Sequence, residues 1–289
     1  MTIGEAISEG AEALRLRRGD DARRTAGLLL GHVLGLDRAQ MIARSKDQVS
    51  ESDLEKYRAL IGRSAEGEPL QHLTGHQEFY GLDLIVTRDV LIPRPETEFL
   101  VERTLALAKS AGQETLLIVD LGTGSGCIAI ALAKMLTGAR LIAIDVSEAA
   151  LNVARPNAER HDVADHIEFL RSDFLDALSQ RGSEGQIDFI VSNPPYVPAD
   201  DPEMVQAEVR DWEPSIALFG GEDGLDFYRR LLRESPPFLK RGGCLIFEIG
   251  FRQLEAIKKM IDESEWILCE VTEDLQGIPR VVSLRRRGA

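Results

Sequence analysis

Cysteine is scarce in this sequence, and its few copies form no pattern. The three cysteines lie far apart, with no CxxC pair among them: Cys127, Cys244 and Cys269. An odd number of scattered cysteines argues against a disulfide framework and a cysteine-based zinc site. Each lies in an apolar stretch, so we expect three buried, reduced thiols that pack as small hydrophobic side chains. The five histidines also lack metal-ligand spacing, and no metal is expected.

Long hydrophobic runs are missing as well. No apolar run approaches the roughly 18 residues that mark a membrane-spanning helix, and the first residues resemble neither a signal peptide nor a transit peptide. We therefore expect a cytoplasmic protein without a membrane partner. A hydrophobic content of 44% in 289 residues is nevertheless enough for a real core, in one large or two ordinary domains.

Basic residues are outnumbered by acidic ones. The chain has 34 Lys and Arg against 48 Asp and Glu, which gives a formal net charge of -14. Proteins that bind nucleic acid through its phosphate backbone depend on clusters of Lys and Arg. The acidity therefore argues against direct binding of nucleic acid, and an enzyme or a binding protein is the default expectation.

The N-terminal part of the chain has the periodicity of helices. The segment 2–5 has the form of a capping box, S/T-x-x-E, ahead of an apolar-periodic stretch. Further helices fit residues 21–36 and 38–44, and another begins after Ser50 or Ser52. We predict a helical bundle over residues 1–73. The expected apolar stripe of its second helix consists of Leu28, Leu29, Val33 and Leu34.

A linker follows, over residues 74–92. Gly75 and Gly81 punctuate two short strand-like runs, which predicts a β-hairpin. Pro93 and Pro95 then break the chain just before a helix that is expected to begin near residue 96.

From residue 115 onward, short apolar strands alternate with helices. This alternation predicts a parallel sheet with right-handed crossovers. The last two runs have no helix between them, so they should pair antiparallel. The sequence thus predicts an α/β domain over residues 93–289, with a seven-stranded Rossmann-like sheet that ends in a hairpin. The predicted strands are TLLIVD, ARLIAID, HIEFL, IDFIV, GGCLIFEIG, WILCEVTE and PRVVSLR.

A glycine-rich turn, DLGTGSG, joins the first of these strands to its helix. Gly122, Gly124 and Gly126 have G-x-G-x-G spacing, which differs from the G-x-G-x-x-G of dinucleotide binders. Glycines permit a tight turn and close backbone approach, and the helix N-terminus behind them presents free N–H groups. The turn either binds a ligand or is purely structural.

Two more candidate residues follow the next two strands. Asp145 ends the second strand, about 20 residues beyond the glycines, where a carboxylate can accept hydrogen bonds from the hydroxyls of a ribose. Alternatively, Asp145 only opens the next helix. Phe174 follows the third strand, at the sheet edge where ligands of open α/β sheets bind. Its ring either flanks a purine or belongs to the core.

The stretch NPPY, residues 193–196, directly follows the apolar run IDFIV. Proline lacks a backbone N–H and fixes its own φ, and it pushes the preceding residue towards extended conformations. The turn therefore offers acceptors at Asn193 and Pro194, and an aromatic ring at Tyr196. A planar NH2 group, which donates twice and needs to accept nothing, fits such a site. The alternative is a sharp structural turn.

Together these features resemble the class I S-adenosylmethionine-dependent methyltransferases. The resemblance covers residues 93–289 and implies S-adenosylmethionine as cofactor and S-adenosylhomocysteine as product. It implies that the glycine loop lies against the methionine part, that Asp145 holds the ribose and that Phe174 lies by the adenine. The cofactor-binding residues are then Gly122, Thr123, Gly124, Ser125, Gly126, Asp145, Phe174 and Asn193.

NPPY also matches the (N/D)PP(Y/F/W) motif of methyltransferases that modify a planar nitrogen. The resemblance implies that Asn193, Pro194 and Tyr196 are catalytic, and that these three and Pro195 bind the substrate. Oxygen atoms of Asn193 and Pro194 would accept the two N–H bonds, and Tyr196 would stack on the flat group. Because the lone pair of such a nitrogen is delocalised, in-line placement supplies much of the rate, about 7–11 kcal/mol at best.

Three further stretches narrow the resemblance. They are LIPRPETE, PLQHLTGHQEFYG and EVRDWEPSIALFGGEDGLDFYR. With the helical N-terminal domain, they are similar to the peptide chain release factor N5-glutamine methyltransferases (HemK/PrmC type) over essentially the whole chain. That family methylates the glutamine of the Gly-Gly-Gln (GGQ) motif. The resemblance implies release factors as partners and N-terminal helices that help to hold them.

Other functions stay open at this point. A glutamine methyltransferase for a ribosomal protein would share the catalytic motifs. Amino-methylation of adenine in nucleic acid would use the same tetrapeptide, although the charge of the chain opposes it. A degenerate fold without activity would serve as a binding module.

A few residues carry expectations about local structure. Pro156 falls inside the helix after Asp145 and should kink or end it. Glu96 and Glu98 flank a helix start and are expected to favour its dipole rather than to act in catalysis. Trp212 is an interface or a lid residue, and the sequence does not decide between them.

Overall fold

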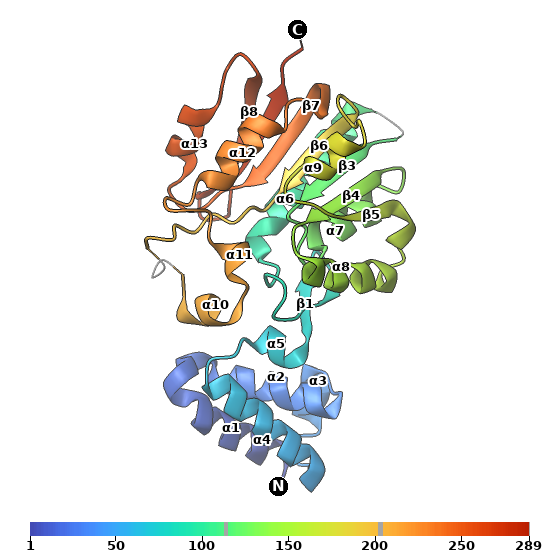
Figure 1. Ribbon diagram of the computed structural model, residues 1–289. Helices are drawn as coiled ribbons and strands as arrows, with labels where there is room; N and C mark the ends of the chain where they lie inside the picture. The colour runs from blue at the N-terminus through green and yellow to red at the C-terminus, as the bar shows by residue number, and fades with distance from the viewer. Residues whose placement is uncertain (113–114, 202–204, 289) are drawn as a thin grey trace. The chain divides into compact units, whose positions relative to one another are not determined.

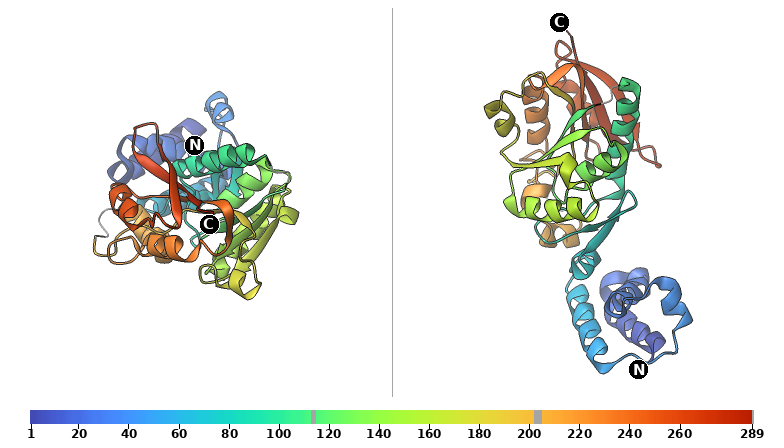
Figure 2. Two further views of the ribbon diagram at one scale, coloured as in Figure 1. Left: turned by 90° about the horizontal axis from the view of Figure 1, so that it is seen from above. Right: turned by 90° about the vertical axis from the view of Figure 1, so that its right-hand side faces the viewer.

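The computed structural model describes residues 1–112, 115–201 and 205–288. They form two compact units, Met1–His76 and Gln77–Ala289, which Figures 1 and 2 show from three directions. Within the described ranges, no helix is both long enough and apolar enough to cross a membrane.

The first unit is built from helices. The predicted capping box starts the first of them, because the Thr2 hydroxyl accepts from the Glu5 N–H and the Glu5 carboxylate accepts from the Thr2 N–H. Ser50 caps the fourth α-helix, as expected. The elements are α1 (Ile3–Arg18), η1 (Gly19–Asp21), α2 (Ala22–Leu34), α3 (Arg38–Ala43), α4 (Glu51–Ala65) and α5 (Leu70–Thr74).

The core of this unit lies between α1, α2 and α4. Leu14, Leu29, Leu30 and Tyr57 are almost fully buried there, and the Tyr57 hydroxyl donates to the Ala6 carbonyl. The prediction of the apolar stripe on α2 is wrong at one position. Leu28 is 43% exposed, and the neighbouring Leu30 takes the buried place, because successive helix residues point about 100° apart.

A β-hairpin opens the second unit. Its strands β1 (His76–Phe79) and β2 (Leu82–Ile85) form a two-stranded sheet. Tyr80 and Gly81 connect them, and both have positive φ, at 52° and 76°. Such a pair is typical of the tight turns that match the twist of hairpin strands. Phe79 and Leu84 are buried in the core of the α/β unit.

The main sheet has the predicted seven strands, in the order β5-β4-β3-β6-β7-β9-β8. Neighbours from β5 to β7 are parallel, whereas β9 is antiparallel to both β7 and β8. The prediction of a terminal antiparallel hairpin is confirmed. The strands are β3 (Leu117–Leu121), β4 (Arg140–Asp145), β5 (Ile167–Arg171), β6 (Ile187–Ser192), β7 (Leu239–Glu248), β8 (Trp266–Glu273) and β9 (Pro279–Arg286).

Helices pack on both faces of this sheet and create two apolar layers. Alternate residues of a strand enter different layers: Ile118 packs with α6, α7 and the hairpin, whereas Val119 packs with α9, α12 and α13. The helical elements are η2 (Pro95–Thr97), α6 (Glu98–Ala111), α7 (Cys127–Met135), α8 (Glu148–Arg160), η3 (Ala164–His166), α9 (Asp176–Gln180), α10 (Ala207–Trp212), α11 (Ser215–Leu218), α12 (Asp226–Glu234) and α13 (Leu254–Met260).

Pro156 was predicted to kink or end its helix, and it does not end it. Helix α8 continues through it to Arg160. The next residue explains why the following turn stays in place. Asn157 is fully buried, and its amide group donates to the carbonyls of Ile85 and Ser125 and accepts from the Ile85 N–H. Tertiary contacts therefore outweigh the local cost of the proline.

The cysteines are only partly as expected. Cys127 and Cys244 are buried, and desolvation raises the pKa of both thiols. Cys269 is exposed, so the prediction of three buried thiols is wrong there. It lies on β8, which ends the sheet and has mostly exposed residues. An apolar run on an edge strand does not guarantee burial.

We predict that Asn157→Ala destabilises the second unit by about 2–4 kcal/mol, because it leaves three backbone groups, one buried and two partly buried, without their partner. Urea unfolding followed by circular dichroism measures the loss. Asn152→Ala on the exposed side of α8 is the matched control and should change stability little. Equal effects of the two substitutions would show that the bonds of Asn157 do not matter.

Candidate active site

The glycine-rich loop lies at the carboxyl end of β3. The N–H groups of Gly122 and Thr123 both donate to the Ile144 carbonyl on β4, at 2.8 and 2.9 Å. Gly122, Gly124 and Gly126 have φ values of 76°, 54° and 83°, a region that side chains disfavour. The spacing G-x-G-x-G thus reflects three left-handed backbone positions in one turn.

Close packing is a second reason why glycine is required at position 126. A Cβ atom at Gly126 would lie 3.0 Å from Ile130 Cδ1 and 3.1 Å from Ala154 Cβ. Gly126 therefore brings α7 and α8 together behind the loop, whereas Gly122 and Gly124 line the cavity described below. Asp120 braces the same turn, because its Oδ2 accepts from the Thr123 hydroxyl and the Ala129 N–H.

Asp145 connects the glycine loop to the start of α8. Its Oδ2 accepts from the Gly124 N–H and its Oδ1 from the Ser147 N–H, both at 2.9 Å. Burial raises the pKa of this carboxyl. Each carboxylate oxygen can accept a further hydrogen bond, and Asp145 lines the cavity. Asp145 therefore binds the N–H of Ser147, just before α8, and lines the cavity at the same time.

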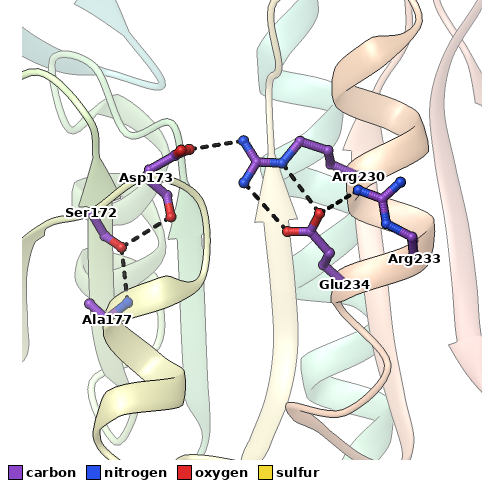
Figure 3. Close-up of polar contacts among 6 residues, drawn as sticks. All are labelled: Ser172, Asp173, Ala177, Arg230, Arg233 and Glu234. Carbon is purple, nitrogen blue, oxygen red and sulfur yellow. Dashed lines mark hydrogen bonds and ion pairs between the residues drawn. The ribbon is translucent and has the colours of Figure 1, made fainter.

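Phe174 also lines the cavity and has a left-handed backbone, with φ of 53°. The Arg230 guanidinium stands 4.4 Å from the centre of its ring, a cation–π contact. Figure 3 shows Arg230 reaching from α12 to Asp173, with Glu234 on its other side; Arg230 Nη1 lies 2.9 Å from Asp173 Oδ1. Phe174 belongs both to the cavity wall and to the core, so its two predicted roles are compatible.

NPPY leaves the sheet at the end of β6. The Ser192 hydroxyl donates to the Leu121 carbonyl at 2.7 Å and holds the strand end beside β3. The Asn193 amide nitrogen donates to the Thr97 hydroxyl at 3.0 Å. The other atom of this amide, Oδ1, is buried and has no hydrogen-bond partner among the described residues. A buried acceptor without a donor is costly and rare, and a catalytic role is one of the reasons for which proteins retain such a group.

A buried carboxylate stands behind Asn193. Glu248, at the end of β7, accepts from the Thr97 hydroxyl at 2.6 Å and from the Tyr196 hydroxyl at 3.3 Å. Burial raises the pKa of Glu248 to about 7, and the hydrogen bonds from Thr97 and Tyr196 oppose this shift. The first and last residues of NPPY are thus both connected to one carboxylate.

Two cavities meet at Asn193. One, of about 390 Å³, is lined by the glycine loop, Asp145 and Phe174. The other, of about 530 Å³, is lined by Pro194, Tyr196, further residues after β6 and β7, and Arg280 of β9. Both include Leu91, Arg94, Asn193 and Ala217 in their walls. The structure therefore brings the predicted site residues to one place, on two sides of a single amide.

An ion pair between Glu213 and Arg94 joins two segments that line the cavities. Glu213 is buried, and its carboxylate accepts from the Ile92 N–H at 2.9 Å and from Arg94 Nη2 at 2.5 Å. It joins the segment before α6 to the segment after NPPY. Nearby, Arg88 stacks on the ring of Trp212, at 4.4 Å. Trp212 therefore has a contact within its own chain.

Sequence reasoning assigned no role to Thr97, Glu248 or Arg230. Glu98, which it weighed as a dipole partner, accepts from the Tyr80 N–H and holds the hairpin turn. Glu96 is one of the charges that raise the pKa of Glu248. The available signal was a glutamate inside the apolar run GGCLIFEIG, because a carboxylate in a buried strand needs a partner.

Comparison with known proteins gives matches along the chain. The family model for the PrmC N-terminal domain matches residues 5–75, and that for the methyltransferase small domain matches residues 96–209. A release factor glutamine methyltransferase of Koribacter versatilis is 40% identical over 286 residues, 99% of each chain. That of Geobacter sulfurreducens is 41% identical over 266 residues, 92% of this chain and 90% of the relative.

Solved structures match as well. The crystal structure of a methyltransferase from Pyrococcus furiosus superposes with a TM-score of 0.52 at 18% identity, over 73% of this chain and 91% of that one. At this identity the match supports the methyltransferase fold alone.

We predict that Arg94→Ala lowers the stability of the second unit by about 3 kcal/mol, because the buried Glu213 carboxylate loses its cation. Thermal unfolding by calorimetry tests this. Arg210→Ala, which removes an exposed partner of Asp211, is the control and should matter little. An unfolding temperature unchanged by Arg94→Ala would mean that the ion pair does not hold the walls.

Proposed function

The chain belongs to the family of release factor glutamine methyltransferases. We propose that it transfers a methyl group from S-adenosylmethionine to a glutamine side chain of peptide chain release factors. The acceptor is the amide nitrogen (N5) of the glutamine in the GGQ motif. The observation that carries this proposal is the Asn193 amide. Its Oδ1 is buried without a donor in the described structure, and the residue lies between two cavities.

The smaller cavity is the proposed place of the cofactor. Its volume of about 390 Å³ lies within the range of small-molecule sites, roughly 300–1,000 Å³. Backbone groups of the glycine loop would hold the methionine part, Asp145 would accept from the ribose hydroxyls, and Phe174 with Arg230 would enclose the adenine. When bound, S-adenosylmethionine supplies an electrophilic methyl group on a sulfonium.

The larger cavity is the proposed place of the glutamine. A carboxamide nitrogen carries two hydrogens, and Asn193 Oδ1 accepts one while the Pro194 carbonyl accepts the other. Tyr196 lies along the flat face of the group. Each neutral hydrogen bond stabilises the complex by only about 0.5–1.5 kcal/mol, but together they fix the direction of the nitrogen. Orientation of the reacting atoms is worth far more, about 7–11 kcal/mol.

The reaction needs no strong base. The glutamine nitrogen forms a bond to the methyl carbon as the bond between carbon and sulfur breaks. The nitrogen then carries a positive charge, becomes acidic and releases one proton to water. Asn193 and Pro194 stabilise this state, because acceptors interact more strongly with a charged donor.

The N-terminal unit is the proposed docking element for the release factor. We assign residues 1–73 to substrate recognition, residues 74–92 to a hairpin linker and residues 93–289 to methyl transfer. The match of the PrmC N-terminal domain to residues 5–75 supports this division. A cytoplasmic location follows from the proposed substrate, because release factors act on ribosomes.

We predict that purified enzyme with S-adenosylmethionine adds one methyl group to the glutamine of the GGQ peptide of a release factor. Asn193→Ala should lower the rate by about 100-fold or more, because the nitrogen loses its orientation. Binding of S-adenosylhomocysteine, measured by calorimetry, should remain close to that of the wild type. Mass spectrometry of the digested release factor locates the methyl group.

Matched substrates decide between this function and its alternatives. A release factor with GGA in place of GGQ should not be methylated, nor should a ribosomal protein or duplex DNA compete as a substrate. Transfer to either of the latter two, without transfer to the release factor, would overturn the proposed function.

A further inference from the structure

We propose that Thr97 and Glu248 are positioning residues that determine which end of the Asn193 amide faces the substrate. This inference rests on the proposed function, because it concerns how the amide comes to present an acceptor rather than a donor. Among the described residues, neither Thr97 nor Glu248 lines the second cavity, whereas Thr97 lines the first.

The contacts join three side chains, from the end of β7, from η2 and from the loop after β6. Glu248 at the end of β7 accepts from Thr97 of η2 at 2.6 Å, and Thr97 accepts from Asn193 Nδ2 at 3.0 Å. Glu248 and Thr97 are 2% and 1% exposed. Water therefore does not compete for these hydrogen bonds, and their direction is set by the protein.

The direction follows from the number of protons. An ionised carboxylate can only accept, so the single hydroxyl proton of Thr97 must point to Glu248. The Thr97 oxygen then has only lone pairs left for Asn193, and it can bind the NH2 end of the amide but not the oxygen end. A flipped amide would place two acceptors against each other, with a cost of about 1–3 kcal/mol. Oδ1 is thereby left for the substrate.

The same carboxylate also holds the other end of the tetrapeptide. The Tyr196 hydroxyl donates to the second oxygen of Glu248, at 3.3 Å. The Tyr228 hydroxyl donates to the backbone carbonyl of Glu248. Glu248 thus orients an amide and an aromatic ring on the two sides of Pro194 and Pro195.

Protonation of Glu248 should remove this directional control. A carboxylic acid can itself donate to Thr97, which frees the Thr97 proton for a flipped Asn193. The pKa of Glu248 is raised to about 7, mainly by burial and also by the charge of Glu96, although Thr97, Tyr196 and Arg280 act in the opposite direction. We therefore expect the rate of methyl transfer to fall as the pH drops below about 7.

The effect on stability has the opposite sign. Because the pKa of Glu248 is higher in the folded chain than its ordinary value of 4.5, its protonation favours the folded state. This contribution is fully present below pH 4.5 and is lost as the pH rises through about 7. A loss of activity below pH 7 that comes from Glu248 is therefore not a loss of folding.

Single-turnover methylation of a release factor, measured from pH 5.5 to 9, tests the inference. Thr97→Val should lower the rate of methyl transfer by about 10- to 100-fold, because the Asn193 amide loses the hydrogen bond that fixes its orientation. Thr97→Ser keeps the hydroxyl and should restore most of the rate. Thr104→Val is the matched control, since Thr104 is equally buried on α6 and its hydroxyl donates to the Leu100 carbonyl within the same helix. Glu248→Gln should be slow at high pH and should lose the decline below pH 7.

The outcomes separate this inference from the proposed function. A wild-type enzyme that does not methylate release factors overturns both. An active wild type whose rate is unchanged by Thr97→Val, or whose decline below pH 7 persists in Glu248→Gln, overturns the positioning role alone. Binding of S-adenosylhomocysteine by each variant verifies folding, and the pH profile of Glu248→Gln decides the matter if Thr97→Val does not fold.

Discussion

The hydrogen bond between the Asn193 amide nitrogen and the Thr97 hydroxyl is the constraint on which the site depends. It occupies the donor end of the Asn193 amide and leaves the oxygen, which is buried without a donor in the described structure, as the free acceptor. The proposed substrate group is another amide, whose NH2 end must be recognised. An asparagine with either orientation would bind the two ends of a glutamine carboxamide equally well. A fixed orientation selects the end that reacts.

The sheet brings the partners of this constraint together. Because β3 lies between β4 and β6, the glycine loop, Asp145 and Asn193 leave adjacent parallel strands at the same edge. This is the edge at which ligands of open α/β sheets bind. The neighbouring strand β7 contributes Glu248, and η2 contributes Thr97 from outside the sheet. The Glu213–Arg94 pair and the buried Asn157 then hold the loops around this edge.

Features with a local cause could be predicted from the sequence. The capping box at Thr2, the parallel sheet with its terminal antiparallel hairpin and the tight glycine turn after the first strand depend on nearby residues or on general rules of chirality. Long-range packing could not be predicted. The burial of Leu30 in place of Leu28 depends on which face of α2 meets the neighbouring helices. Cys269 is exposed because its strand lies at the edge of the sheet. Helix α8 continues past Pro156 because of the contacts of Asn157. Thr97 and Glu248 are 151 residues apart, and no local pattern joins them.

A crystal structure of the enzyme with S-adenosylhomocysteine and a GGQ-containing release factor tests the central claim most directly. The account predicts the glutamine amide nitrogen at hydrogen-bond distance, about 2.7–3.2 Å, from Asn193 Oδ1, with Nδ2 still on Thr97 and the cofactor sulfur in line beyond the nitrogen. A glutamine bound outside the cavity of Pro194 and Tyr196, or an Asn193 side chain turned away from it, would contradict the account.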